Sequence, residues 1–163
     1  MPDVVGSILI RTPRERVFDF VTTPSTWPRW YPITRAVTGS VDHPALPGDE
    51  WVEEVKLGVW HGFFHWRALE RDRPNRFHYE GTATSPGLLG KISSGGLGKI
   101  TYVFTEQDGG TLFNRELDYS SPNLLMAIFD KLDYHKHIVE ASSQALQNLK
   151  DLLESGPAPT SVM

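Results

Sequence analysis

Cysteine is absent from the sequence. A chain without thiols has no disulfide framework, no thiolate-ligated zinc or iron–sulfur cluster and no cysteine nucleophile, and it is compatible with a reducing cytoplasm. Chelating histidine spacing is missing too, since His61 and His65 lie about 13 Å apart if they share a strand. No HExxH motif occurs. We therefore expect no metal and no cofactor.

The sequence also lacks an excess of positive charge and a long apolar run. Sixteen Lys and Arg stand against twenty Asp and Glu, a net charge of −4, which disfavours binding to nucleic acid. The apolar run at residues 4–10 is too short to span a bilayer and lacks the flanks of a signal peptide. We expect a cytoplasmic protein with no membrane span and no nucleic-acid partner.

The length and composition favour one globular domain. The chain has 163 residues, of which 39% are hydrophobic and 11% aromatic, enough to bury one sizeable core. Its last residues are rich in proline and unpatterned. We expect a single ligand-binding domain over residues 1–154 and a disordered tail over residues 155–163.

Hydrophobic periodicity outlines the secondary structure. A short β-branched strand precedes Thr12-Pro13-Arg14-Glu15, which has the pattern of a capping box that opens a helix. A proline-punctuated helical turn follows at residues 25–32. Period-two alternation then predicts six strands, at residues 33–41, 50–56, 59–71, 76–82, 99–106 and 111–119. From residue 123 to 154 the apolar spacing becomes helical, which predicts a helix about 45 Å long.

This order of elements predicts an α+β fold. A curved antiparallel seven-stranded sheet should wrap around the long C-terminal helix, with two short helices between the first two strands. We expect an internal cavity of several hundred Å³ between sheet and helix. The aromatic side chains expected to line it are Trp27, Trp30, Trp51, Trp60, Phe64, Trp66, Phe77, Tyr79, Tyr102, Phe104 and Tyr119.

Four candidate catalytic residues share this inward face. Glu53 and Glu70 would have raised pKa values there and serve as general acid or base, or else sit at the cavity mouth or pair with an arginine. Arg115 would hold a carboxylate or enolate oxygen, or be the buried partner of one of those glutamates. His135, on the helical stripe, is a candidate base or a histidine satisfied by a neighbouring carbonyl.

Two further segments invite a functional reading. The glycine-rich segment at residues 83–97 fails the spacing of a phosphate-binding loop, and we expect a loop or lid instead. Four arginines around one hairpin would dock an acidic acyl carrier protein or form a solvated basic patch: Arg67, Arg71, Arg73 and Arg76.

Several local motifs resemble the START-like helix-grip superfamily (SRPBCC), and within it the polyketide cyclase/dehydrase branch. They are residues 10–18, the aromatic segment at residues 27–32, Asp108-Gly109-Gly110-Thr111 and residues 145–150, and the resemblance runs from Val4 to Glu154. It implies a helix-grip fold with a ligand cavity, and Trp27 matches an aromatic position of the family. Aligned through Trp66, Glu70 stands where aromatic-polyketide cyclases carry an inward arginine, so their catalytic constellation is not carried over.

The sequence thus predicts a protein that holds a hydrophobic or aromatic small molecule in its cavity. A polyketide cyclase or dehydratase is the leading reading, in which one or two polar groups assist enolisation or loss of water. The alternative is a non-catalytic carrier or sensor of a lipid, quinone or steroid-like ligand. A third reading is an interaction module of the chaperone-activator type, which needs an exposed docking face.

Overall fold

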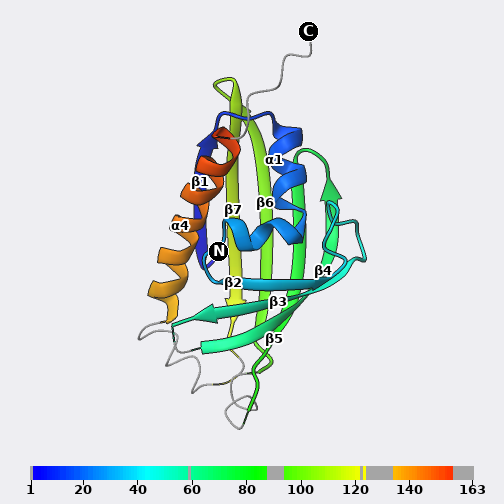
Figure 1. Ribbon diagram of the computed structural model, residues 1–163, viewed down its shortest axis with the longest axis vertical. Helices are drawn as coiled ribbons and strands as arrows, with labels where there is room; N and C mark the ends of the chain where they lie inside the picture. The colour runs from blue at the N-terminus through cyan, green and yellow to red at the C-terminus, as the bar shows by residue number, and fades with distance from the viewer. Residues whose placement is uncertain (1, 59, 88–93, 122, 124–133, 156–163) are drawn as a thin grey trace.

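A computed structural model describes residues 2–58, 60–87, 94–121, 123 and 134–155. Over these residues the structure shows seven strands, two α-helices and one 3-10 helix (Figure 1). In chain order they are β1 (Val4–Ile10), α1 (Arg14–Val21), η1 (Pro24–Arg29), β2 (Thr34–Gly39), β3 (Glu50–Leu57), β4 (Trp60–Asp72), β5 (Arg76–Thr84), β6 (Leu97–Gln107), β7 (Gly110–Ser120) and α4 (His135–Glu154).

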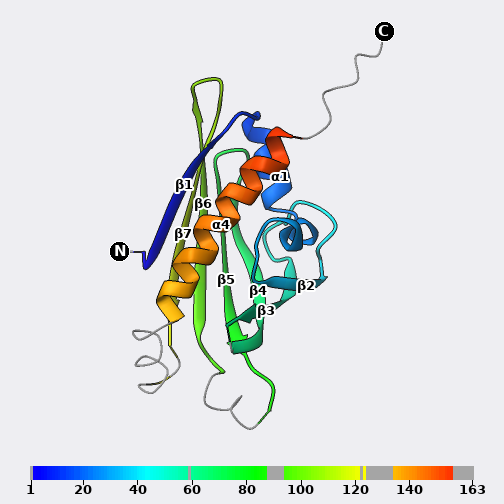
Figure 2. The ribbon, with the colours of Figure 1, turned by 60° about the vertical axis from the view of Figure 1, so that its left-hand side comes forward.

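The strands form one antiparallel sheet in the order β1-β7-β6-β5-β4-β3-β2. Strands β2 to β7 form a meander in chain order, and the last strand, β7, pairs with the first, β1. All three helices lie on the same face of the curved sheet (Figure 2). This is the helix-grip arrangement that the sequence predicted, and strand boundaries agree within a few residues.

The register of the sheet confirms the predicted inward face. Trp51 lies opposite Trp66, Ala68 opposite Tyr79 and Tyr102 opposite Arg115, and these side chains are all buried. Because side chains alternate with a period of two, each of these pairs sets the facing of its neighbours along the strand.

A bulge in β4 overturns the predicted position of Glu70. The pairing with β5 shifts between Ala68 and Glu70, so that one extra residue enters the strand and the alternation reverses. The Glu70 side chain is 66% exposed and lies 3.7 Å from Arg76. Glu70 is therefore on the surface and not in the interior.

The described part of the C-terminal helix begins at His135, so the expected first half of the predicted stripe, at residues 124–133, lies outside the described residues. Ile138, and not Val139, is buried at the start of α4, which rotates the buried stripe by one residue there. His135, the first residue of α4, is exposed. Its predicted inward position is wrong.

Thr12 does not cap α1 as its sequence pattern predicted. The helix begins after Pro13 without a side-chain cap, and the Thr12 hydroxyl donates instead to the carbonyl of Leu153 at 3.3 Å. The Thr111 hydroxyl donates to the Thr12 carbonyl at 2.7 Å, and the Arg11 amide donates to Glu154 at 2.9 Å. These bonds join the C-terminal end of α4 to the ends of β1 and β7.

The space beneath α1 is filled by aromatic side chains. The Phe18 ring lies 5.0 Å from Phe104 and 6.3 Å from Phe77, and Phe104 lies 5.2 Å from Phe113, measured between ring centroids. All four side chains are buried, so this half of the molecule has a solid core.

Among the described residues, no helix is long and apolar enough to cross a membrane. The expected tail beyond Ser155 and the middle of the expected loop, at residues 88–93, lie outside the part of the chain that the structure describes.

Replacing Leu149 by alanine should destabilise the protein by about 2–5 kcal/mol, because this side chain of α4 is fully buried and its loss leaves a cavity. Val139→Ala is the matched control on the same helix, since Val139 is 39% exposed and should change stability by about 0.5 kcal/mol or less. Urea denaturation followed by circular dichroism measures both. Equal losses would show that the buried stripe of α4 is placed wrongly.

Candidate functional site

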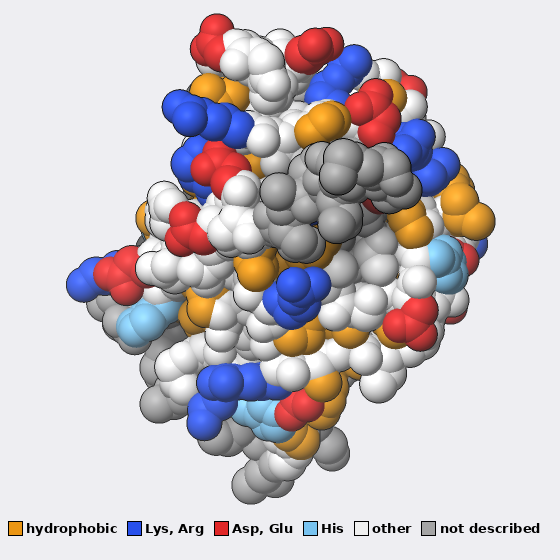
Figure 3. Space-filling model, turned by 45° about the horizontal axis from the view of Figure 1, so that its top comes forward, with side chains coloured by type: hydrophobic (Ala, Val, Ile, Leu, Met, Phe, Trp, Pro, Cys, Tyr) orange, Lys and Arg blue, Asp and Glu red, His pale blue; other side chains and the backbone are white. Residues whose placement is uncertain are grey.

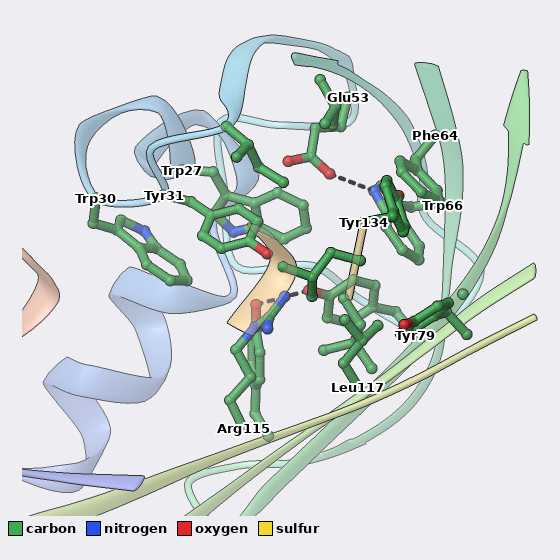
Figure 4. A pocket seen from close by; sticks show the side chains of 17 residues that line it. Trp27, Trp30, Tyr31, Glu53, Phe64, Trp66, Tyr79, Arg115, Leu117 and Tyr134 are labelled. Atoms are coloured by element: carbon green, nitrogen blue, oxygen red, sulfur yellow. Dashed lines mark hydrogen bonds between the residues drawn. The ribbon is translucent and has the colours of Figure 1, made fainter. Parts of the chain in front are cut away.

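A cavity opens between the sheet, η1 and α4, beside the solid core (Figure 4). The space between the lining atoms, including the open mouth, is about 590 Å³. The part of the cavity that water can occupy is smaller, about 50 Å³. The latter is room for several waters, so an enclosed cavity of several hundred Å³ was an overestimate. A ring-sized ligand must move lining side chains apart or extend through the mouth.

Most of the predicted aromatic residues lie on its wall, and four do not. The lining includes Trp27, Trp30, Phe64, Trp66, Tyr79, Tyr102 and Tyr119. The four that the cavity does not reach belong to the packing around it: Trp51 against Trp27 and Tyr79, Trp60 against Phe64 and Tyr134, and Phe77 and Phe104 beneath α1.

Glu53 projects into the cavity from β3 and is 3% exposed. Thr34 donates its hydroxyl to one carboxylate oxygen at 2.5 Å, and the Trp66 indole N–H donates to the other at 2.8 Å. Burial raises the pKa of Glu53, while these two hydrogen bonds and the charge of Arg115 oppose the rise. The outcome is a buried carboxyl group held in one orientation, with a pKa above its ordinary value.

Trp66 owes its position to Gly98 on β6. A Cβ atom at residue 98 would lie 2.9 Å from the Trp66 ring, so only glycine leaves room for the indole there. The ring also stacks on Phe64, with centroids 4.9 Å apart and planes 10° from parallel. These contacts aim the indole N–H at Glu53.

Arg115 enters the cavity from β7, on the side opposite Glu53 (Figure 4). Its side chain is 3% exposed, and its guanidinium carbon lies 4.8 Å from the centre of the Tyr31 ring, a cation–π contact. Nη1 donates to the Ser142 hydroxyl at 3.3 Å, and Nε has no hydrogen-bond partner among the described residues. Although burial lowers the pKa of Arg115, the neighbouring tyrosines raise it on balance, so the group remains a cation.

Tyrosine hydroxyls complete the polar part of the wall. The Tyr79 and Tyr102 hydroxyls are 2.7 Å apart and hydrogen-bonded to each other. Burial raises the pKa of Tyr102 to about 12 and that of Tyr79 well above its ordinary value, so both are neutral phenols near pH 7. The site therefore combines neutral donors with one permanent cation.

Two polar contacts of the site were not predicted from the sequence. Thr34 holds Glu53, and Tyr31 carries the Arg115 guanidinium on its ring. Neither has a sequence signal of its own, because each reaches its partner only through the fold.

Of the four candidate catalytic residues, the structure brings two to the cavity, Glu53 and Arg115. Glu70 is on the outer surface, and His135 does not line the cavity. The His135 Nδ1 atom lies 2.9 Å from the hydroxyl of Tyr119, which does line it. His135 is thus a rim residue in contact with the wall.

Two of the four arginines near the β4–β5 hairpin lie beside carboxylates. Arg73 forms two hydrogen bonds with Asp19, Arg76 lies 3.7 Å from Glu70, and the Arg71 guanidinium lies over the Phe18 ring. Basic and acidic side chains are interspersed over the face shown in Figure 3. Docking of an acidic acyl carrier protein at this cluster stays a prediction.

Within the described ranges, no group of three histidine or acidic side chains could hold a metal ion. His61 contacts Glu54 and His65 contacts Thr84, so the two histidines have separate partners on the outer face of the sheet.

Comparison with solved structures shows the same fold in several proteins. MLL2253 from Mesorhizobium loti has a TM-score of 0.68 at 16% identity, over 95% of this chain and 98% of that chain. TTHA0849 from Thermus thermophilus has a TM-score of 0.69 at 16% identity, over 91% and 94%. DynU16, a protein of the dynemicin biosynthetic locus, has a TM-score of 0.62 at 15% identity, over 94% of this chain and 47% of its own. At these identities the likeness concerns the fold alone.

No curated protein matches the sequence. A family model does: it is described as polyketide cyclase / dehydrase and lipid transport, and it matches residues 1–154. With nearly the whole chain matched, and with the sheet, the helix and the cavity arranged as described above, this protein belongs to the polyketide cyclase / dehydrase and lipid transport family.

Proposed function

We propose that the protein binds one hydrophobic small molecule, containing aromatic or similarly flat rings, in the cavity between the sheet and α4. The observation that carries the proposal is the cavity wall, where tryptophan, tyrosine and phenylalanine side chains surround a few oriented polar groups. Such walls are typical of small-molecule sites. The family description, which includes lipid transport as well as cyclase and dehydrase proteins, supports it.

Narrowing the cavity should weaken binding. Ile138 lines the cavity from α4 and is 5% exposed, whereas its neighbour Val139 is 39% exposed on the outer side of the same helix. We expect Ile138→Phe to weaken binding of the neutral dye N-phenyl-1-naphthylamine by about tenfold or more, as loss of ~1.4 kcal/mol already gives tenfold. The measurement is dye fluorescence, together with quenching of tryptophan emission.

Val139→Phe is the control, because it adds the same ring outside the cavity, and its dye affinity should equal that of the wild type. Mass spectrometry of the purified protein should also detect a hydrophobic compound released on denaturation. If the wild type binds no dye and releases no compound, the proposal fails. If both variants bind as the wild type does, the ligand site is elsewhere.

A catalytic role as a cyclase or dehydratase is favoured by one observation, the buried carboxyl group of Glu53 inside the cavity. Loss of water from a β-hydroxy ketone requires removal of a proton next to the carbonyl and protonation of the departing hydroxyl. A carboxyl group that keeps its proton is suited to the second step, and donors near the carbonyl oxygen stabilise the enolate. A non-catalytic carrier would need only the apolar wall.

The two roles differ in what Glu53→Gln should do. In an enzyme, dehydration of 4-hydroxy-4-phenyl-2-butanone to the conjugated enone should fall by about 10²–10⁴-fold. Dye affinity should stay within about tenfold, because losing one hydrogen bond costs about 0.5–1.5 kcal/mol. The rising ultraviolet absorbance of the enone measures turnover.

Glu54→Gln is the matched control, since Glu54 is the next residue on β3 and contacts His61 on the outer face. It should keep full turnover. Turnover that survives Glu53→Gln would exclude Glu53 as the acid, and a wild type without turnover on this and related hydroxy ketones would favour the carrier.

The protonation of Glu53 also has a signature in stability. The folded protein holds a proton that the unfolded chain releases above the ordinary pKa of 4.5, so stability should fall as the pH rises past that value. Glu53→Gln cannot release this proton. We therefore expect the wild type to lose stability relative to Glu53→Gln as the pH rises above 4.5, measured by urea midpoints. Glu54→Gln should follow the wild type, and parallel curves for Glu53→Gln and the wild type would show that the carboxyl pKa is not raised.

A further inference from the structure

Arg115 is a buried cation without an acidic partner. No carboxylate among the described residues forms an ion pair with it. Arg73 and Arg76, in contrast, each lie beside a carboxylate on the surface. Removing a guanidinium from water is costly unless charge and hydrogen bonds compensate, and buried arginines are therefore normally paired. The fold holds this charge at the cavity wall, where a bound molecule can reach it.

Glu53 also lines the cavity, but it does not form an ion pair with Arg115. Its two oxygens are taken by Thr34 and Trp66, and it enters from the opposite side of the cavity (Figure 4). The sequence left open whether Arg115 pairs with a glutamate or receives a ligand oxygen. The structure removes the first of these, because Glu70 is on the surface as well.

The donors of Arg115 are only partly used. Nε is buried and has no hydrogen-bond partner among the described residues, and Nη1 makes one long bond of 3.3 Å to Ser142. The Tyr31 ring supports the guanidinium at 4.8 Å, and the neighbouring Tyr31 and Tyr102 hydroxyls interact with its N–H groups, while Nε stays without a partner among the described residues. The paired hydroxyls of Tyr79 and Tyr102 lie on the same part of the wall and offer a further donor.

We propose that Arg115 is an anion-binding site and that the ligand of the cavity is a flat hydrophobic molecule carrying one acidic oxygen group, a carboxylate or an enol or phenol oxygen, that binds this guanidinium. The inference rests on the proposed function and narrows it, because it predicts that neutral ligands of the same shape bind more weakly. The apolar wall takes the rings, and Arg115 fixes the orientation of the charged end.

Isothermal titration calorimetry with matched probes tests the inference. At pH 7 the wild type should bind 2-naphthoate about 10- to 100-fold more tightly than 2-naphthamide, which has the same rings and no charge. In Arg115→Met, which keeps a long apolar side chain, the two affinities should differ by less than about threefold. A third probe, 2-naphthol, is titrated at about pH 10, where its hydroxyl is ionised, and tells a phenolate from a carboxylate. Preference for either anion over the amide that is lost in Arg115→Met supports the inference.

Arg67→Met is the matched control, because Arg67 is exposed on β4 and its loss lowers the net charge by the same amount. It should keep the preference for naphthoate. Arg115→Gln, a neutral polar replacement, should likewise reduce the preference to less than about threefold, so the test remains decisive if the methionine variant does not fold.

The outcomes separate the two proposals. If the wild type binds 2-naphthamide as tightly as 2-naphthoate and 2-naphthol, the anion site is wrong while the hydrophobic cavity stands. If Arg67→Met loses the preference as Arg115→Met does, the effect comes from overall charge and the inference is overturned. If no naphthalene probe and no dye binds, the proposed function fails with it.

Discussion

The antiparallel register of the sheet is the constraint on which the site depends. Glu53 and Trp66 meet because β3 and β4 are paired so that Trp51 stands opposite Trp66, two residues along from Glu53. Arg115 stands opposite Tyr102 on the neighbouring strand, which brings the cation to the Tyr79–Tyr102 pair. A shift of one residue in any of these pairings would turn the polar groups outward and the outer histidines inward. The chemistry of the cavity is therefore fixed by hydrogen bonds between strands.

The sequence predicted the strands, their order and most of the inward face, because alternation is visible without tertiary information. It failed at Glu70, since one bulged residue reverses the alternation and nothing in the local sequence announces it. The alternation also predicted that both Phe77 and Phe64 line the cavity. Both face inward, but α1 fills the space above Phe77 and leaves Phe64 at the cavity, a difference set by where a distant helix packs. The contacts that Thr34 and Tyr31 make were not predicted for the same reason.

The surroundings of Glu53 and Arg115 have opposite effects on their charges: they favour the neutral form of Glu53 and the charged form of Arg115. Glu53 has a strong donor for each oxygen and a pKa raised by burial, so its charge can be removed by protonation. Arg115 cannot lose its proton and has few acceptors, so its charge persists. One wall thus offers a proton that can be exchanged, and the opposite wall offers a fixed positive field. A molecule bound between them would experience a gradient of electrostatic potential along its length.

The bonds that join Thr12, Arg11 and Glu154 attach the C-terminal end of α4 to the sheet, and at its first residue the His135 Nδ1 atom lies 2.9 Å from the Tyr119 hydroxyl of β7. Ile138, which borders the cavity, is 15 residues from Leu153, about 22 Å along the helix at 1.5 Å per residue. A rotation of about 5° around the attached end would displace Ile138 by about 2 Å, which is more than the radius of a water molecule. The width of the cavity at Ile138 is therefore sensitive to the tilt of α4, and a tilt of this size would leave every strand pairing intact.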